Sequence, residues 1–213
     1  VGSGRSALAP IGILLGCWLI AGVAVDLWLR AGRRLTRLTR LPRADWGKAL
    51  AHGGLGVMFI GVAAIQGWNV EDIRTVPVGD SFPLGAYEVR LTGVSEQQGP
   101  NYLTTVGEVH LLRGGVEIAT LYPEKRFYPV AAMATTEAAI LNGVLRDIYV
   151  VLGDRQQDGG WAVRSYIKPF ANWIWSGAIL MAIGGAFSLS DRRLRVAGGA
   201  RAGRSQPVFD PAE

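Results

Sequence analysis

Three long apolar stretches constrain the fold of this chain more than any other feature of its sequence. They cover residues 7–29, 48–66 and 171–189. Each is close to the ~20 residues that an α-helix needs to cross the hydrocarbon core of a bilayer. We therefore expect an α-helical membrane protein fragment with three transmembrane helices.

Charge is segregated along the chain, and its distribution indicates the orientation of these helices. Residues 69–168 carry 12 acidic and 9 basic residues, whereas basic residues crowd the connection between the first two stretches and follow the third. The two basic clusters consist of Arg30, Arg33, Arg34, Arg37, Arg40, Arg43 and Lys48, and of Arg192, Arg193, Arg195, Arg201 and Arg204. Because positive charge marks the cytoplasmic side, we expect the connection and the tail inside and the N-terminus outside. Both clusters abut apolar stretches, which argues against a nucleic-acid partner.

The expected organisation has four parts. Residues 1–68 form two transmembrane helices, at about 7–29 and 48–66, joined by a basic cytoplasmic loop. Residues 69–168 form a periplasmic β-rich domain, residues 169–190 the last transmembrane helix, and residues 191–213 a basic, disordered cytoplasmic tail. The chain begins with Val rather than Met, so we interpret it as the C-terminal piece of a larger protein of the bacterial inner membrane.

A small all-β domain is expected between the second and third helices. Its residues form short β-rich runs separated by turn residues, and helical periodicity gives way to alternation. Gly114-Gly115 and Asp158-Gly159-Gly160 are hairpin signals. The expected strands are 87–94, 102–112, 116–122, 138–142, 147–152 and 161–166. The one cysteine, Cys17, lies in the first apolar stretch, so this domain has no disulfide framework.

One histidine, His52, lies just inside the second apolar stretch. Trp46 and Trp68 bracket this stretch 22 residues apart, which is roughly 33 Å along a helix and matches tryptophans at the two membrane interfaces. A neutral imidazole about one turn inside the cytoplasmic edge can ligate a metal or haem iron, relay a proton, or hydrogen-bond to a neighbouring helix. The residues alone leave these three roles open.

Small residues beside His52 predict a close approach of another group. They are Ala49, Gly53 and Gly56, at i, i+4 and i+7. This spacing lets a second helix pack closely, and the same clearance suits a macrocycle. Asp26 is a candidate partner for the second ring nitrogen, and it is equally well explained as an interfacial charge next to Arg30.

Four spaced blocks resemble the C-terminal region of the CcmF family. They are 122–128 (YPEKRFY), 136–140 (TEAAI), 146–153 (RDIYVVLG) and 161–170 (WAVRSYIKPF). CcmF is the membrane subunit of the bacterial cytochrome c maturation system that hands haem to apocytochrome c. The helix with Ala51-His52-Gly53-Gly54 and the closing Trp173-Ile174-Trp175 stretch also fall where that family has them.

The resemblance implies a subunit of a haem lyase, in which His52 is one of two axial ligands of a bound b-type haem. It places the other ligand on an upstream helix that is absent here. The partners it implies are apocytochrome c, the haem chaperone holo-CcmE, CcmH/CcmI-type subunits, the lipid bilayer and quinol as an electron source. The family's tryptophan-rich external segment and its two external histidines have no counterpart here, and His110 does not match them, so we do not expect the chain alone to transfer haem.

Charged residues of the four blocks have two interpretations. They form surface ion pairs that contribute little individually, or they form a docking surface for partner subunits or haem propionates. We favour structure plus docking over direct haem contact. The residues are Pro123, Glu124, Lys125, Arg126, Glu137, Arg146, Asp147, Arg164 and Lys168.

Two other functions compete with haem handling. A non-catalytic membrane scaffold would dock partner proteins through the β-domain, with His52 making only an interhelical hydrogen bond. A solute transporter would use His52 as a proton relay, but it would need broken helices and further buried charges, of which the sequence offers only Asp26. Replacement of His52 by Ala separates the scaffold from the haem protein.

Overall fold

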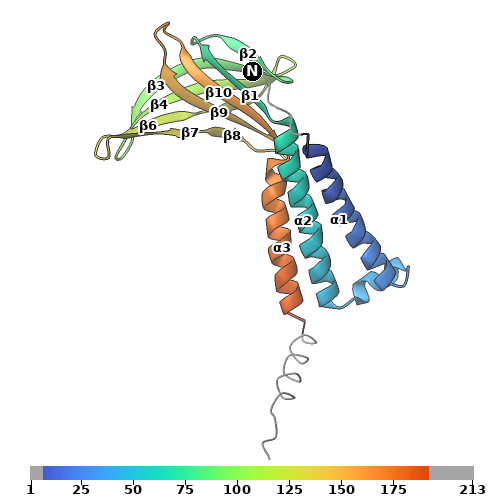
Figure 1. Ribbon diagram of the computed structural model, residues 1–213. Coiled ribbons are helices and arrows are strands. Elements are labelled where there is room, and N and C mark those ends of the chain that lie inside the picture. Colours follow the sequence, from blue (N-terminus) through green and yellow to red (C-terminus); the bar gives the residue numbers. More distant parts are fainter. Residues whose placement is uncertain (1–6, 192–213) are drawn as a thin grey trace, which may run out of the picture. The chain divides into compact units, whose positions relative to one another are not determined.

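The computed structural model describes residues 7–191, so the tail arginines lie outside the described part of the chain. Within that part, three helices are long and apolar enough to cross a membrane (Figure 1). They are α1 (Ala9–Arg30), α2 (Arg43–Trp68) and α3 (Ala171–Leu189), and a short 3₁₀ helix, η1 (Leu35–Arg40), connects the first two. The chain divides into two compact units, residues 1–13 with 60–174 and residues 14–59 with 175–213.

The first unit contains ten strands in two antiparallel sheets, flanked by the ends of the three helices. The strands are β1 (Val70–Val76), β2 (Ser81–Leu84), β3 (Tyr87–Gln98), β4 (Leu103–Arg113), β5 (Val116–Leu121), β6 (Glu124–Tyr128), β7 (Met133–Glu137), β8 (Ala139–Leu141), β9 (Arg146–Arg155) and β10 (Trp161–Pro169). One sheet has the order β1-β10-β9-β8 and the other β2-β3-β4-β6-β7, with β5 also paired to β4. The expected all-β domain is therefore confirmed.

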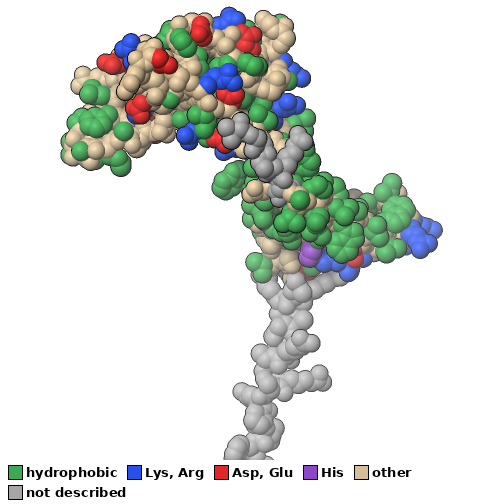
Figure 2. Space-filling model, turned by 45° about the horizontal axis from the view of Figure 1, so that its top comes forward, with side chains coloured by type: hydrophobic (Ala, Val, Ile, Leu, Met, Phe, Trp, Pro, Cys, Tyr) green, Lys and Arg blue, Asp and Glu red, His purple; other side chains and the backbone are tan. Residues whose placement is uncertain are grey.

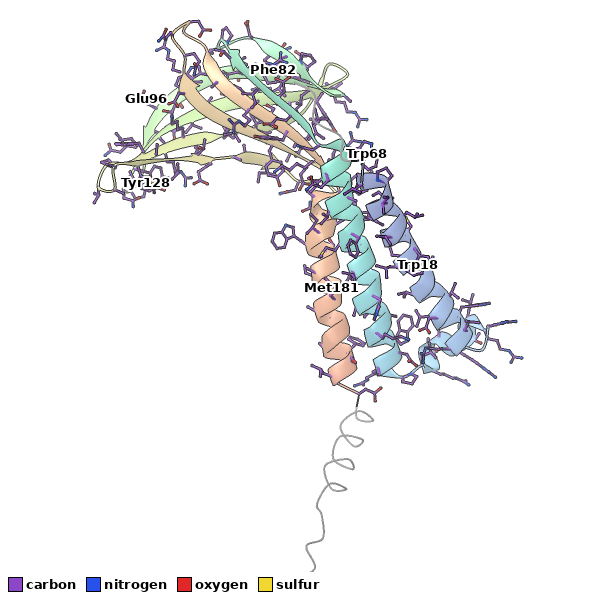
Figure 3. The ribbon with its side chains drawn as sticks, in the orientation of Figure 1. Trp18, Trp68, Phe82, Glu96, Tyr128 and Met181 are labelled. Atoms are coloured by element: carbon purple, nitrogen blue, oxygen red, sulfur yellow. The ribbon has the colours of Figure 1, made fainter. Side chains whose placement is uncertain are left out.

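Alternating side chains from both sheets build one hydrophobic core. Val89 on β3, Val109 on β4, Val150 on β9 and Val163 on β10 are each at most 1% exposed. Phe82 on the short edge strand β2 is also buried at 4% (Figure 3). Since successive side chains of a strand point to opposite faces, the residues directly before and after each of these positions face away from the core.

Four of the ten strands were not expected from the sequence. β1, β2 and β7 are edge strands, and β6 joins β7 to the sheet. β6 and β7 contain no buried residue, and β2 contains Pro83, which is confined to edges because it cannot donate to the ladder. β6 and β7 therefore lack the alternation of buried apolar residues that marks the longer strands, and β2, although Phe82 and Leu84 alternate inward, is only four residues long.

The second unit contains most of the helical length and η1. Large apolar side chains remain exposed on its helices, including Trp18 on α1 at 70% and Trp175 on α3 at 72%. Hydrophobic side chains cover much of this part of the surface in Figure 2, and Trp18 and Met181 mark two of its helices in Figure 3. Such a contiguous apolar surface indicates a membrane or further protein around it.

Glycines bring α2 and α3 into backbone contact. A Cβ at Gly54 would lie 2.6 Å from the carbonyl oxygen of Gly177, and one at Gly184 would lie 2.6 Å from that of Gly47. Gly177 and Gly184 are the buried residues of α3. This is the close packing that small residues permit between apolar helices.

Of the small residues expected to admit another group, Gly56 faces a helix of this chain and Gly53 does not. A Cβ at Gly56 would lie 2.8 Å from the carbonyl oxygen of Gly16 on α1, so this position does admit a helix. A Cβ at Gly53 would meet nothing within 4 Å, because that side of α2 is open. The neighbouring Gly54 faces α3 instead.

Candidate functional site

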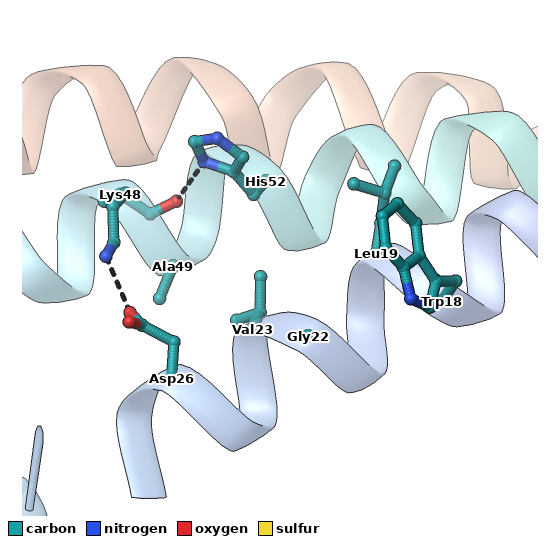
Figure 4. A pocket seen from close by; sticks show the side chains of 8 residues that line it. All are labelled: Trp18, Leu19, Gly22, Val23, Asp26, Lys48, Ala49 and His52. Atoms are coloured by element: carbon teal, nitrogen blue, oxygen red, sulfur yellow. Dashed lines mark hydrogen bonds and ion pairs between the residues drawn. The ribbon is translucent and has the colours of Figure 1, made fainter. Parts of the chain in front are cut away.

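An open cavity of about 250 Å³ lies between α1 and α2 in the second unit (Figure 4). Its lining residues are Trp18, Leu19, Gly22, Val23 and Asp26 from α1 and Lys48, Ala49 and His52 from α2. No atom lies within 4 Å of a Cβ built at Gly22, so this glycine leaves the wall open. His52 thus stands at the charged end of a mostly apolar cavity.

The orientation of the His52 ring is set by the backbone of its own helix. Its Nδ1 lies 2.9 Å from the carbonyl oxygen of Lys48, one turn earlier (Figure 4). Because a carbonyl oxygen only accepts, the Nδ1 of the neutral ring carries the proton and Nε2 keeps its lone pair. Nε2 has no hydrogen-bond partner within residues 7–191. This tautomer is the one in which a helix histidine can ligate a metal through Nε2.

Asp26 is an ion-pair partner and not the acceptor for His52. Its carboxylate lies 2.6 Å from Lys48 Nζ and 3.0 Å from Arg30 Nε. Arg30 also reaches Asp45, at 3.0 Å. Of the two roles considered for Asp26, the pairing with Arg30 is therefore observed, and its place at a membrane interface stays a prediction. Lys48 has a double role, since its side chain joins α2 to α1 and its carbonyl orients His52.

The metal-ligating side chains at this cavity suit the iron of a haem better than a bare metal ion. Within the described residues, no group of three or more His, Cys, Asp or Glu side chains could hold a metal ion. A single imidazole nitrogen in a cavity lined by the apolar side chains of Trp18, Leu19 and Val23 would fit haem, whose iron histidine can ligate and whose macrocycle needs an apolar surround. The cavity is smaller than the ~300–1,000 Å³ of most small-molecule sites, so it would form one wall of such a site.

In the β-domain, the structure brings three of the expected charged residues together. Arg126 on β6 lies 2.8 Å from Glu124 and 3.6 Å from Glu137 on β7, and its guanidinium stacks over the ring of Tyr102 at 4.8 Å. The hydrogen bond from Arg126 lowers the pKa of Glu124, although partial burial opposes this shift. The same bond raises the pKa of Arg126. This cluster ties two peripheral strands together.

Asp147 is a buried structural residue rather than a surface ion-pair partner. Only 2% of it is exposed, and its Oδ1 accepts hydrogen bonds from the backbone N–H of Gly143 at 2.9 Å and from Asn172 Nδ2 at 3.0 Å. It thereby joins the start of β9 to the first turn of α3.

The remaining charged candidates lie apart from the Arg126 cluster. Arg146 lies over the ring of Tyr87 at 5.9 Å, and Lys168 lies over that of Tyr149 at 4.2 Å. Arg164 is exposed on β10. Lys125 pairs with Asp154, and Pro123 is fully buried. The predicted docking residues thus differ in partner and in burial, and whether they dock a partner stays a prediction.

His110 forms a separate charged group that the sequence did not reveal. Its Nδ1 lies 2.8 Å from Glu117 on β5 and its Nε2 lies 3.1 Å from Glu108 on β4. Hydrogen bonds to Glu117 and Glu108 raise the pKa of His110, because both favour the imidazolium form. The sequence did not predict this contact because Glu117 lies near His110 only when β4 and β5 pair.

Comparison with known proteins gives consistent matches. The family described as CcmF C-terminal beta-sandwich matches residues 41–169. The chain is 54% identical over 199 residues to the cytochrome c-type biogenesis protein ccl1 of Rhodobacter capsulatus, covering 93% of this chain and 30% of that protein. It is 39% identical over 189 residues to the cytochrome c-type biogenesis protein CcmF of Escherichia coli, covering 89% of this chain and 29% of that protein.

A solved structure, described as Cytochrome c Heme Lyase CcmF, shares the fold. It matches with a TM-score of 0.64 at 17% identity, over 89% of this chain and 35% of that one. The chain spans less than a third of the length of the two curated relatives named above.

Proposed function

The chain belongs to the CcmF family, and on this premise we propose that it is the C-terminal part of a cytochrome c maturation protein of the bacterial inner membrane. In this role it takes part in delivering haem to apocytochrome c and attaching it covalently. His52 is one axial ligand of a b-type haem. The observation that carries the proposal is the hydrogen bond from His52 Nδ1 to the Lys48 carbonyl oxygen, since it leaves Nε2 available to iron.

Most residues that line the cavity have a stated role in this proposal. The Lys48 carbonyl holds the ring in one tautomer, and the ion pair of Lys48 with Asp26 fixes α2 against α1 at the same turn. Trp18, Leu19 and Val23 offer an apolar wall that excludes water. A b-type haem would supply a one-electron iron centre there. The second axial ligand would come from sequence beyond this chain.

The orientation follows from charge in the same proposal. The basic connection around η1 lies in the cytoplasm, and residues 69–168 lie in the periplasm, where apocytochrome c and the haem chaperone holo-CcmE are met. CcmH/CcmI-type subunits dock on the β-domain, for which β6 and β7, which contain no buried residue, offer a surface that carries the ion pairs of Arg126. Quinol is the proposed source of electrons for the haem.

The two histidines of the chain provide a matched experiment. The full-length protein is purified as wild type, His52→Ala and His110→Ala. Reduced-minus-oxidised optical spectra of the three proteins are then recorded. We expect a b-type spectrum in the wild type and in His110→Ala, and its loss or alteration in His52→Ala. Loss of haem should also stop cytochrome c maturation while the protein still accumulates.

The competing scaffold function predicts a different pattern. If His52 only hydrogen-bonds within the membrane, maturation survives its replacement and the three spectra agree. A b-type spectrum unchanged in His52→Ala would remove the ligand role of His52, and absence of haem in all three proteins would leave the scaffold.

A further inference from the structure

Five arginines in the connection after α1 and at the first residue of α2 have no acidic partner among residues 7–191. The nearby carboxylates, Asp26 and Asp45, are occupied by Arg30 and Lys48. The other arginines of the connection are exposed and form no ion pair within residues 7–191; they are Arg33, Arg34, Arg37, Arg40 and Arg43. Figure 2 shows basic side chains gathered at one end of the helical part. Within residues 7–191 the positive charge of these arginines is therefore not neutralised by carboxylates, so it can attract anionic groups.

The 3₁₀ helix η1 sorts its residues into three faces. Its sequence is Leu-Thr-Arg-Leu-Thr-Arg, and side chains three residues apart eclipse each other because a 3₁₀ helix has three residues per turn. Leu35 and Leu38 therefore share one side, and Arg37 and Arg40 share another. No residue of η1 is buried, and Leu35 is 69% exposed. An apolar ridge of exposed Leu35 and half-buried Leu38 thus runs beside a row of two exposed guanidinium groups.

Specific hydrogen bonds hold this short helix in place. The indole Nε1 of Trp46 on α2 donates to the carbonyl oxygen of Leu38 at 3.1 Å. The N–H of Leu41 donates to the same carbonyl at 3.2 Å, which closes the end of η1. At its start, Gly32 and Arg33 adopt the left-handed conformation, with φ of 63° and 61°, so that the chain turns sharply after α1. The apolar ridge and the guanidinium row therefore lie on a helix that hydrogen bonds hold against α2.

We propose that η1 binds the phosphate groups of anionic phospholipids at the membrane surface. Arg37 and Arg40, together with exposed Arg33 in the turn before η1, would contact the phosphates, for which a planar guanidinium offers paired donors. Leu35 and Leu38 would enter the boundary of the acyl chains. An apolar ridge beside the arginines fits a phospholipid, whose headgroup meets the arginines and whose acyl chains meet the leucines. Free phosphate and a nucleic-acid backbone have no acyl chains to contact the ridge. The inference rests on the membrane insertion of α1 and α2 in the proposed function, and not on the haem ligand.

Lipid retention tests the arginine row. The full protein is reconstituted into vesicles of equal phosphatidylglycerol and phosphatidylcholine, re-extracted in mild detergent, and the retained lipids are counted by mass spectrometry. We expect phosphatidylglycerol to be enriched on the order of fivefold. The triple variant Arg33→Gln, Arg37→Gln, Arg40→Gln should retain the two lipids about equally.

A matched variant controls for loss of charge. Arg113→Gln, Arg155→Gln and Arg164→Gln remove the same three charges from exposed sites on the β-domain and should keep the enrichment. Equal retention of both lipids by the wild type, or enrichment kept in the η1 variant, overturns the proposal. Since the η1 arginines are exposed, the variant should keep the melting temperature and the optical spectrum of the wild type. A protein without haem but with the lipid preference would refute only the function of His52.

Depth within the membrane tests the apolar ridge. In a Cys17→Ser background, Leu35→Cys or Thr36→Cys is labelled with a polarity-sensitive fluorophore in phosphatidylglycerol vesicles. We expect the label at Leu35 to be quenched more by acyl-chain nitroxides than the label at Thr36. Equal quenching overturns the proposed orientation. Displacement of phosphatidylglycerol by millimolar inorganic phosphate or by a short RNA would assign the arginines to free phosphate or nucleic acid and overturn the lipid assignment.

Discussion

Replacement of Gly184 by alanine is expected to loosen the contact between α2 and α3. The new Cβ would lie 2.6 Å from both the carbonyl oxygen of Gly47 and the backbone nitrogen of Ala51, against 3.4 Å for ordinary van der Waals contact. Backbone atoms cannot rotate away as a side chain can. The two helices must therefore part locally by the difference of about 0.8 Å.

The neighbouring Gly185 isolates this effect. It lies on the same helix, and a Cβ there would meet nothing within 4 Å. Alanine improves intrinsic helix propensity by up to about 1 kcal/mol at either position, so this gain cancels between the two variants. What remains is the cost of overpacking, about 1–3 kcal/mol, to which the weakened dispersion contacts between the parted helices contribute. At roughly 2–4 °C per kcal/mol, Gly184→Ala should melt about 2–12 °C below Gly185→Ala.

Thermal unfolding of the purified protein in one detergent, followed by tryptophan fluorescence, measures this difference. Gly185→Ala should melt at or slightly above the temperature of the wild type. Equal melting temperatures for the two variants would refute the reasoning, because they would mean that the backbones of α2 and α3 do not approach as closely as the glycines indicate.

Two further predictions concern the β-domain. Asp147→Ala removes a buried charged acceptor of two hydrogen bonds and should lower the free energy of unfolding by about 2–4 kcal/mol in urea titration, whereas Asp154→Ala, whose side chain is 77% exposed, should be nearly neutral; equal losses would contradict this. Because hydrogen bonds to Glu117 and Glu108 raise the pKa of His110 above 6.5, its stabilisation is complete below pH 6.5 and is lost as the pH rises through the raised value. Melting profiles across this range should therefore converge between wild type and His110→Gln as the pH rises, and parallel profiles would count against the ion pairs.

Hydropathy was enough to predict the three helices, since their length and apolar composition do not depend on any partner. The third was expected at 171–189, and α3 covers those residues. α2 begins earlier than expected, at Arg43 instead of Lys48, because polar residues in a first helical turn carry no apolar signal. Strands β3, β4, β9 and β10 were found because their buried side chains alternate.

Residue types alone predicted which side chains belong to the site, but not the contacts that these side chains make. A titratable ring in an apolar stretch directed attention to His52, but its acceptor is the backbone carbonyl of Lys48, and every residue has such a carbonyl. The choice between Gly53 and Gly54 as the packing glycine depends on the rotation of α2 about its axis. The meeting of Arg126 with Glu137 depends on the register of β6 and β7. Both quantities come from the tertiary fold.

The first and last strands of the β-domain are hydrogen-bonded neighbours, with Val70 opposite Ile167. α2 ends at Trp68 and α3 begins at Ala171, so folding of the domain brings the end of one helix near the start of the other. A loop of about 100 residues is thereby closed by the sheet, and its closure entropy no longer opposes helix association. The third helix then meets the second at the effective concentration of a short linker. Correct strand pairing in the β-domain would therefore also promote the association of α2 with α3.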